Sequence, residues 1–179
     1  MGIVLTKLWR LLWSQTEYKI CIVGLDNAGK TTVLYRLIYN ESVSTSPTIG
    51  SNVEELRYKN IRLMVWDIGG QESLRQSWST YYVNSKAVIM VIDSSDVGRL
   101  HIAKAELHRM LEHEHLKSAC LLVFANKQDV KDSRSAMQIS EALALSTLKD
   151  RHWHIQGCCA ITGEGLHDGL DWIVTRLTS

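Results

Sequence analysis

Short apolar runs alternate with polar, turn-forming segments along this chain, and the runs have the lengths of β-strands. The run 87–93 is apolar up to its final aspartate, which is typical of a strand buried on both faces of a parallel sheet. Segments 53–58 and 61–66 flank Lys59-Asn60 and predict two strands joined by a hairpin-like turn. The predicted strands are 20–23, 53–58, 61–66, 87–93, 120–125 and 152–158.

Apolar residues at helical spacing predict helices between several of these strands. In 99–112, one face of the predicted helix carries Leu100, Ala103, Leu107, Met110 and Leu111. The predicted helices cover 32–38, 99–112, 136–145 and 166–177.

A phosphate-binding loop is predicted between the first strand and the first helix, where Gly24-Leu25-Asp26-Asn27-Ala28-Gly29-Lys30-Thr31 fits G-x-x-x-x-G-K-[ST]. Its two glycines let successive N–H groups point at phosphate oxygens, and the helix N-terminus adds partial positive charge. Lys30 supplies a cation for the outer phosphates, and the Thr31 hydroxyl can ligate Mg²⁺. Thr32, the next residue, is also predicted to bind phosphate. The alternative is a chance match in a glycine-containing turn, against which the strand and helix argue.

Two further segments supply candidate groups for a third phosphate. The polar loop 40–50 carries Thr48, whose hydroxyl can close over Mg²⁺ when a γ-phosphate is present. The apolar run 63–66 delivers Asp67, a carboxylate for the Mg²⁺ coordination sphere. Behind it, the Gly70 N–H can approach a γ-phosphate, and the Gln71 amide can orient an attacking water. Gly-Gly-Gln alone is a weak signal, but it is strong after an aspartate and a phosphate loop.

The segment Asn126-Lys127-Gln128-Asp129 follows the run 120–125 and indicates which nucleotide base is bound. Asp129 can accept hydrogen bonds from the N1–H and the exocyclic amine of guanine, an edge that adenine does not offer. Lys127 can cover the ring plane, and Asn126 can tie the base loop to the phosphate loop. Backbone amides near Cys159 and Ala160 are placed to contact the guanine carbonyl.

The N-terminus, Met1-Gly2-Ile3-Val4-Leu5-Thr6, fits the N-myristoylation pattern M-G-x-x-x-[ST], with Gly2 as the acceptor. On a helical wheel, 1–15 form a broad apolar face with two tryptophans and a narrow polar stripe, which suits a helix lying among lipid headgroups. A helix packed permanently on the domain is the alternative. Lys7 and Arg10 interrupt the apolar run and argue against a signal peptide. We expect a lipidated helix, 1–15, and a nucleotide-binding domain, 16–179.

Composition narrows the class of protein. At 179 residues the chain suggests one domain, and a net charge of +1 gives no basic field for a nucleic acid. No apolar run has the length of a membrane span. The four cysteines form neither a disulfide framework nor a paired C-x-x-C metal pattern, and we expect buried free thiols at Cys21, Cys120, Cys158 and Cys159.

The motifs G-L-D-N-A-G-K-T-T, P-T-I-G, W-D-I-G-G-Q-E and N-K-Q-D, with the Gly2 start, resemble the ADP-ribosylation factor (Arf/Arl) family of small GTPases along essentially the whole chain. The segments T-S-P-T-I-G-S-N-V-E-E and M-G-I-V-L-T-K-L-W-R look most like its Arf-like protein 5 subfamily. The resemblance implies an α/β, Ras-like fold: a six-stranded, mostly parallel sheet flanked by helices, with an N-terminal amphipathic helix. It also implies binding of GTP, GDP and Mg²⁺.

The resemblance implies roles for individual residues. Thr31 and Thr48 would ligate Mg²⁺, with Asp67 acting through water. The other implied roles are γ-phosphate sensing by Gly70, water positioning by Gln71, and guanine recognition by Asn126, Lys127 and Asp129.

One departure concerns the effector surface, for which the resemblance suggests Ser51, Trp66, Trp78 and Tyr81. The family usually has an aromatic residue at position 51, so Ser51 removes one third of the patch formed with Trp66 and Tyr81. We expect the nucleotide chemistry to be retained and the choice of effector to differ.

The favoured hypothesis is a GTP-gated membrane-recruitment switch in Golgi or endosomal vesicle trafficking. The protein would be a cytoplasmic monomer that associates reversibly with Golgi membranes when GTP is bound. It would hydrolyse GTP slowly and depend on a GTPase-activating protein and an exchange factor, with membrane-tethering or coat components as effectors. The alternatives are a GTP-binding scaffold that cycles little and a P-loop kinase or NTPase, for which no insertion supplies a second substrate pocket.

Overall fold

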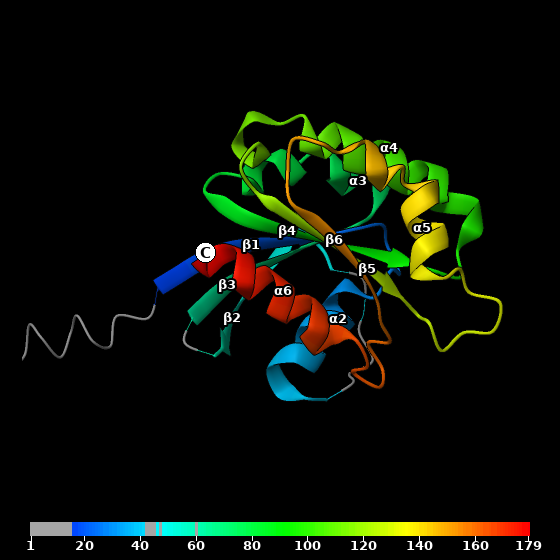
Figure 1. Ribbon diagram of the computed structural model, residues 1–179, viewed down its shortest axis with the longest axis horizontal. Helices are drawn as coiled ribbons and strands as arrows, with labels where there is room; N and C mark the ends of the chain where they lie inside the picture. The colour runs from blue at the N-terminus through cyan, green and yellow to red at the C-terminus, as the bar shows by residue number, and fades with distance from the viewer. Residues whose placement is uncertain (1–15, 42–45, 47, 60) are drawn as a thin grey trace, which may run out of the picture.

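Helices cover both faces of one six-stranded sheet in the computed structural model, which describes residues 16–41, 46, 48–59 and 61–179 (Figure 1). The strand order is β2-β3-β1-β4-β5-β6; β2 pairs antiparallel with β3, and the other neighbouring strands pair in parallel. This arrangement confirms the Ras-like fold that the motifs implied. The strands are β1 (Thr16–Val23), β2 (Ser51–Tyr58), β3 (Ile61–Ile68), β4 (Ser85–Asp93), β5 (Cys120–Asn126) and β6 (Trp153–Gly157).

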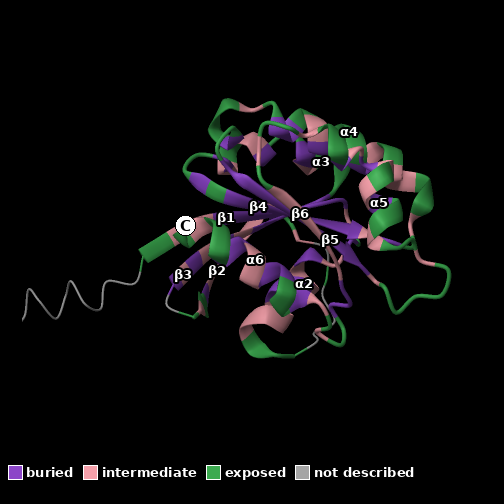
Figure 2. Cartoon of the chain, viewed as in Figure 1, coloured by how far each residue is buried: buried purple, intermediate pink, exposed green. Residues whose placement is uncertain are grey.

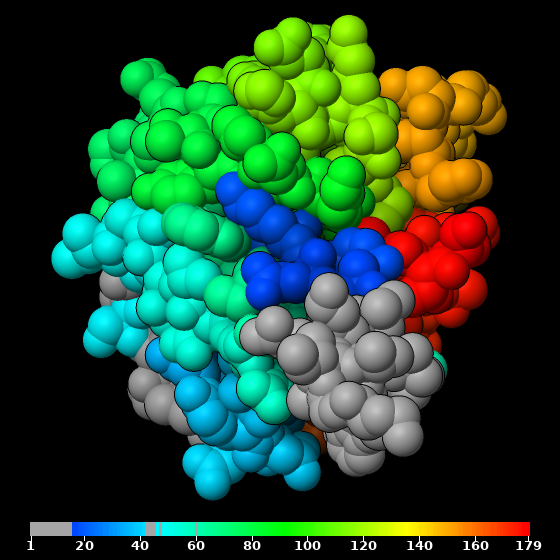
Figure 3. Space-filling model, turned by 90° about the vertical axis from the view of Figure 1, so that its left-hand side faces the viewer, coloured from blue at the N-terminus to red at the C-terminus, as the bar shows by residue number. Residues whose placement is uncertain are grey.

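The helices form one layer on each side of the sheet. In Figure 1, α3, α4 and α5 lie above the sheet, and α2 and α6 lie below it. Figure 3 shows the end of the molecule where β1 starts, beside the C-terminal end of the chain. The helices are α2 (Lys30–Tyr39), α3 (Glu72–Arg75), α4 (Leu100–Leu111), α5 (Ala136–Ala142) and α6 (Leu166–Thr178), with short 3₁₀ helices at Trp78–Tyr81, Val97–Arg99, Glu114–Leu116 and Leu145–Thr147.

Alternating side chains of the central strands build two separate hydrophobic cores, because successive residues of a strand point to opposite faces. On β1, Ile20 and Ile22 pack into the core under α2 and α6, whereas Cys21 and Val23 pack into the core under α4 and α5. Figure 2 shows the buried residues concentrated in the strands and the exposed residues on the outer faces of the helices. The sheet is therefore covered on both faces, as the apolar run at 87–93 predicted.

The six predicted strands and the four helices predicted between and after them are confirmed in order, with shifts at their ends, whereas the short helix α3 was not predicted. The helix predicted for 136–145 ends at Ala142, because Ala144 adopts a left-handed conformation with φ of 55° and a 3₁₀ turn follows. Its start is set by a capping box between Ser135 and Gln138. The last strand starts at Trp153, one residue later than predicted.

The four cysteines are buried and free, as expected from their spacing. In the described part of the chain, no helix combines the length and apolarity needed to cross a bilayer.

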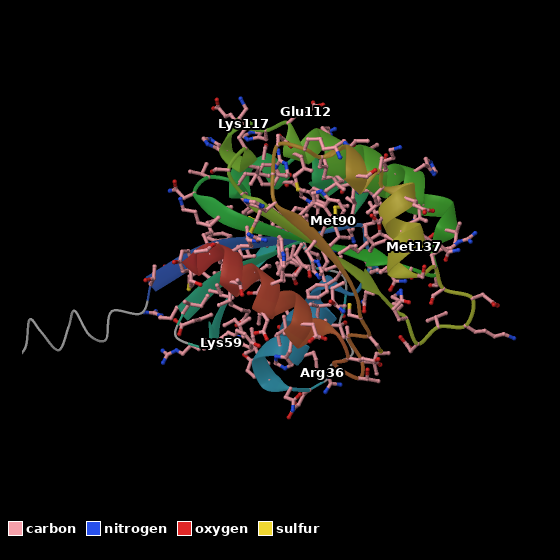
Figure 4. The ribbon with its side chains drawn as sticks, viewed as in Figure 1. Arg36, Lys59, Met90, Glu112, Lys117 and Met137 are labelled. Carbon is pink, nitrogen blue, oxygen red and sulfur yellow. The ribbon has the colours of Figure 1, made fainter. Side chains whose placement is uncertain are left out.

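Phe124, the chain's one phenylalanine, lies fully buried at the centre of β5, and Gly169 of α6 packs against its ring. We expect Phe124→Ala to lower the free energy of unfolding by about 3–5 kcal/mol, because it leaves a cavity between the sheet and α6. Met137→Ala is the control: Met137 lies on the outside of α5 and is 69% exposed (Figure 4). Urea denaturation of both variants checks this, and equal midpoints would contradict it.

Candidate functional site

The loops that follow β1, β3, β5 and β6 surround a cavity of about 420 Å³, a volume typical of sites for small ligands. Most residues predicted from the motifs lie in its wall, although they come from segments far apart in the sequence. Five predicted residues lie outside the wall: Gly24, Leu25, Ala28, Asp67 and Cys159. The wall consists of Asp26, Asn27, Gly29, Lys30, Thr31, Thr32, Ser46, Thr48, Gly70, Gln71, Asn126, Lys127, Asp129, Val130, Ala160 and Ile161.

The phosphate loop is shaped by two glycines that no other residue replaces without strain. Gly24 has φ of 147°, and a Cβ there would lie 2.3 Å from the carbonyl oxygen of Val91 on β4. Gly29 has φ of 93°, and a Cβ there would lie 2.5 Å from Nδ2 of Asn126. The loop is thus pressed against the sheet on one side and against the predicted base loop on the other. This position explains why Gly24 shapes the cavity without lining it.

Lys30 begins α2 and crosses the phosphate loop from inside, where its Nζ donates a 2.9 Å hydrogen bond to the carbonyl oxygen of Leu25. Leu25 and Ala28 are buried in the two cores and anchor the loop. Burial lowers the pKa of Lys30 to about 8, although the carboxylates of Asp67 and Asp26 act to raise it. A phosphate in the cavity would stabilise the ammonium form, because an opposite charge favours the charged state.

Two hydroxyls and one carboxylate converge beside the loop. The Thr31 hydroxyl donates to Oδ2 of Asp67 at 2.5 Å, and the Thr48 hydroxyl lies 3.0 Å from that of Thr31 and 3.4 Å from the same Oδ2. Asp67 is fully buried, and its Oδ1 has no hydrogen-bond partner among the described residues. Burial raises the pKa of Asp67, while the hydrogen bond from Thr31 and the charge of Lys30 act to lower it.

This group of oxygens fits a divalent cation. A buried carboxylate oxygen without a partner is costly, and a cation would satisfy it. Mg²⁺ is commonly held by one or two carboxylates together with substrate phosphates, so a larger acidic cluster is not required. The described residues contain no group of three or more His, Cys, Asp or Glu side chains that could hold a metal. The residues that fit the ion are therefore Thr31, Thr48 and Asp67.

Gly70 packs directly on the backbone of the phosphate loop. A Cβ at Gly70 would lie 2.2 Å from the carbonyl oxygen of Gly24 and 2.6 Å from the amide nitrogen of Asp26. Only a glycine allows this approach, which brings the peptide of residue 70 to the phosphate end of the cavity. Gln71 follows it, is exposed, and lines the cavity as predicted.

Asn126 joins the predicted base loop to the phosphate loop. Its Nδ2 donates to the carbonyl oxygen of Ala28 at 2.9 Å, and its Oδ1 accepts from the amide of Ala160 at 3.0 Å. The side chain is buried, so both bonds are shielded from water. Lys127 lies in the cavity wall, and its Nζ pairs with Asp93 at 2.6 Å.

Asp129 is exposed in the wall, where its carboxylate is accessible to a base. Cys159 is buried outside the wall, and its amide donates to the carbonyl oxygen of Glu164, so its contact with guanine stays a prediction. Ala160 lines the cavity, but its amide donates to Asn126, so its contact with guanine stays a prediction.

Trp78 was predicted to lie on the effector surface, and this is wrong. It is 1% exposed, and its Nε1 donates to the carbonyl oxygen of Gly69 at 2.9 Å. An indole pairs its N–H when it is buried, and here it supports the segment before Gln71. The other three residues are partly exposed. The rings of Trp66 and Tyr81 lie 5.7 Å apart, and Ser51 of β2 pairs with Ile68 at the end of β3.

The motifs missed two arginines, Arg75 and Arg99, which contact Asp26 of the phosphate loop. The sequence carries no signal for these contacts, because nothing in it shows that Arg75 is buried. Gly2 and the helix predicted for 1–15 lie outside the described residues.

The sequence profile of the ADP-ribosylation factor family matches residues 4–177. The chain belongs to this family. ADP-ribosylation factor-like protein 5A from Homo sapiens is 58% identical over 177 residues, covering 99% of this chain and 98% of that protein. ADP-ribosylation factor-like protein 5 from Dictyostelium discoideum is 52% identical over 174 residues, with 97% and 95% covered. ADP-ribosylation factor 1 from Brassica rapa subsp. pekinensis is 50% identical over 179 residues, with 100% and 98% covered.

A solved structure, the Arl6 BBS3 small GTPase from Trypanosoma brucei with the bound nucleotide analogue GppNp, superimposes with a TM-score of 0.85 at 34% identity. The match covers 91% of this chain and 98% of that one. These similarities support the resemblance to the Arf-like protein 5 subfamily. This member of the ADP-ribosylation factor family is thus a GTP-binding small GTPase, a switch in trafficking that hydrolyses GTP.

Asn126→Ala tests the link between the two loops. It leaves the Ala28 carbonyl and the Ala160 amide without their buried partner, which costs about 1–3 kcal/mol, so we expect affinity for GDP to fall roughly 5- to 150-fold. Asn52→Ala is the matched control, since the side chain of Asn52 donates its hydrogen bond to Glu54 of the same strand. Fluorescence titration of nucleotide-free protein measures both variants. An unchanged affinity, or equal wild-type affinities for GDP and ADP, would contradict these roles.

Proposed function

We propose that this protein is a GTP-gated switch that recruits effectors to Golgi membranes during vesicle trafficking. The observation that carries the proposal is the convergence of Thr31, Thr48 and Asp67 beside the phosphate loop, with Gly70 packed on the same loop. A phosphate cradle alone binds nucleotide, whereas this arrangement also distinguishes how many phosphates are present.

Thr48 and Gly70 belong to segments outside the phosphate loop, and both reach the phosphate end of the cavity. A third phosphate would give both segments a common contact, and its loss on hydrolysis would remove that contact. Such ordering of two loops by a γ-phosphate is a recognised form of molecular switching. Thr31 and Thr48 would ligate Mg²⁺, with Asp67 acting through water, and the ion would neutralise charge on the outer phosphates.

Hydrolysis would depend on Gln71, which lines the cavity and can orient the attacking water. No arginine lines the cavity in the described part of the chain. Arg75 and Arg99, which lie near it, are engaged with Gly70 and Asp26. We therefore infer slow intrinsic turnover and an arginine supplied by a GTPase-activating partner, a contribution of about 10³–10⁵ in rate.

Membrane association would come from the N-terminal segment. Gly2 fits the myristoylation pattern, and a single myristoyl chain binds a bilayer only marginally. The amphipathic segment 1–15 would supply the second signal, and nucleotide would control its availability. The resemblance to the family supports Golgi membranes, an exchange factor, a GTPase-activating protein and tethering or coat effectors, with the protein acting as a monomer.

Gln71→Leu tests the hydrolytic role. We expect single-turnover release of phosphate from bound GTP to slow about 100-fold, because the attacking water loses its positioning group. Gln76→Leu, an exposed glutamine just beyond α3, is the matched control and should leave the rate unchanged. An unaltered rate in Gln71→Leu would remove this residue from the mechanism. No measurable wild-type turnover, even with membrane extract added, would favour a scaffold that cycles little.

Gly2→Ala tests the membrane signal. N-myristoylated wild-type protein should co-sediment with phosphatidylcholine–phosphatidylserine vesicles when loaded with a GTP analogue, and should remain in the supernatant with GDP. The variant should stay in the supernatant with either nucleotide, because it has no acceptor for the lipid. Gly98→Ala is the control, since a Cβ there would lie 4.0 Å from Oδ1 of Asp96, an ordinary van der Waals distance, and would clash with nothing. Nucleotide-independent sedimentation of the wild type would contradict the proposed coupling.

A further inference from the structure

Asp26 of the phosphate loop lies in the wall of the cavity that receives phosphates, and it carries a carboxylate. Its amide nitrogen lies next to Gly70, so it stands at the end of the cavity that a terminal phosphate would occupy. An unneutralised carboxylate there would repel a triphosphate more than a diphosphate, because the triphosphate carries more charge and extends closer. The contacts of this carboxylate therefore bear on the nucleotide state.

Arg99 holds Asp26 from the side of α4. Its Nη1 donates to Oδ1 of Asp26 at 3.0 Å, and its Nη2 donates to the carbonyl oxygen of the same residue at 3.2 Å. Nε of Arg99 donates a 2.5 Å hydrogen bond to Oδ2 of Asp96, which fixes the guanidinium. Arg99 is thus oriented by one aspartate and binds both the backbone and the side chain of the other.

Arg75 holds the same carboxylate from the side of α3. Its side chain is 9% exposed, and its Nη2 lies 3.5 Å from Oδ1 of Asp26, with Glu106 of α4 on the other side at 3.9 Å. Its Nε donates a buried 3.0 Å hydrogen bond to the carbonyl oxygen of Gly70. One buried guanidinium therefore joins the phosphate-loop carboxylate to the peptide that packs on that loop.

Two guanidinium groups face the Asp26 carboxylate in this arrangement. Burial acts to raise the pKa of Asp26, but the charge and hydrogen bond of Arg99, and the charge of Arg75, hold the pKa below its ordinary value. The carboxylate is thus ionised at neutral pH and paired with two guanidinium groups.

We propose that Arg75 and Arg99 form a clamp on Asp26 that draws its carboxylate away from the phosphates, and that Arg75 is a positioning residue which fixes Gly70 for contact with a terminal phosphate. This inference rests on the proposed nucleotide switch and deepens it. The clamp acts on the triphosphate state, because a diphosphate does not reach Gly70. Its loss therefore lowers affinity for a GTP analogue more than affinity for GDP.

Arg75→Gln tests the clamp through the ratio of two affinities, measured by fluorescence titration with GDP and with a non-hydrolysable GTP analogue. We expect the affinity for the analogue to fall about 10-fold more than that for GDP, which is the scale of losing one buried charge-assisted contact. Arg109→Gln is the matched control: Arg109 of α4 pairs with Glu106, as Arg75 does, but it is exposed and forms no ion pair with Asp26 among the described residues. Its ratio should equal that of the wild type.

Asp26→Asn, alone and combined with Arg75→Gln, separates charge from packing. If the clamp neutralises Asp26, the ratio of analogue affinity to GDP affinity should be about threefold or more higher in the double variant than in Arg75→Gln alone. The reason is that the double variant has no unpaired carboxylate. If Arg75 has a purely structural role, Arg75→Gln and the double variant should show the same ratio of analogue affinity to GDP affinity. Arg75→Lys keeps the charge but loses the planar fork, so it should recover only part of the preference.

The outcomes distinguish this proposal from the switch on which it rests. If the wild type binds GDP and the analogue but shows no nucleotide-dependent vesicle binding, the switch fails, whatever Arg75 does. If the wild type switches and both Arg75→Gln and Arg99→Gln keep its affinity ratio within about twofold, the clamp is overturned. If Arg75→Gln does not fold, the affinity ratio of Arg99→Gln alone tests the clamp. The Arg99 side chain is about one-third exposed, and its replacement leaves the hydrogen bond from Arg75 to Gly70 intact.

Discussion

Parallel pairing of β1 with both β3 and β4 brings the ends of neighbouring strands to one edge of the sheet, and the loops of the nucleotide site begin there. The phosphate loop follows β1, Asp67 lies near the end of β3, and Asn126 ends β5. A slip of one residue in any pair would turn these side chains to the opposite face. The two buried cores that fix the register therefore also fix the geometry of the site.

The two ends of the site differ in how completely the protein satisfies its own polar groups. At the base end, Asn126 has partners on both sides before any ligand binds. At the phosphate end, Oδ1 of Asp67 lacks a partner among the described residues, and burial lowers the pKa of Lys30. The first arrangement is preformed, whereas a nucleotide and a cation complete the second. Binding should accordingly stabilise the fold, because the ligand selects the native state.

The segment between β3 and α3 is held through its backbone carbonyls. Trp78 donates to the carbonyl of Gly69 and Arg75 to that of Gly70, and both side chains are buried. These donors come from the turns that follow Gln71, so a movement of Gln71 would disturb both. This explains why Trp78 is not a surface residue, and it ties the expected γ-phosphate contact to the packing of α3 and α4.

The sequence by itself determined the order of strands and helices, the phosphate loop and the guanine motif, because spacing and residue type carry these features locally. Val91 against Gly24, Phe124 against Gly169 and Trp78 under Gly69 were decided only by the tertiary structure. The same holds for the pairing of Arg75 and Arg99 with Asp26. These contacts join residues that are distant in the chain, and burial of an arginine or tryptophan depends on which helix covers it. A sequence motif shows which chemical groups the site contains, whereas the packing of the fold determines which distant residues hold those groups in position.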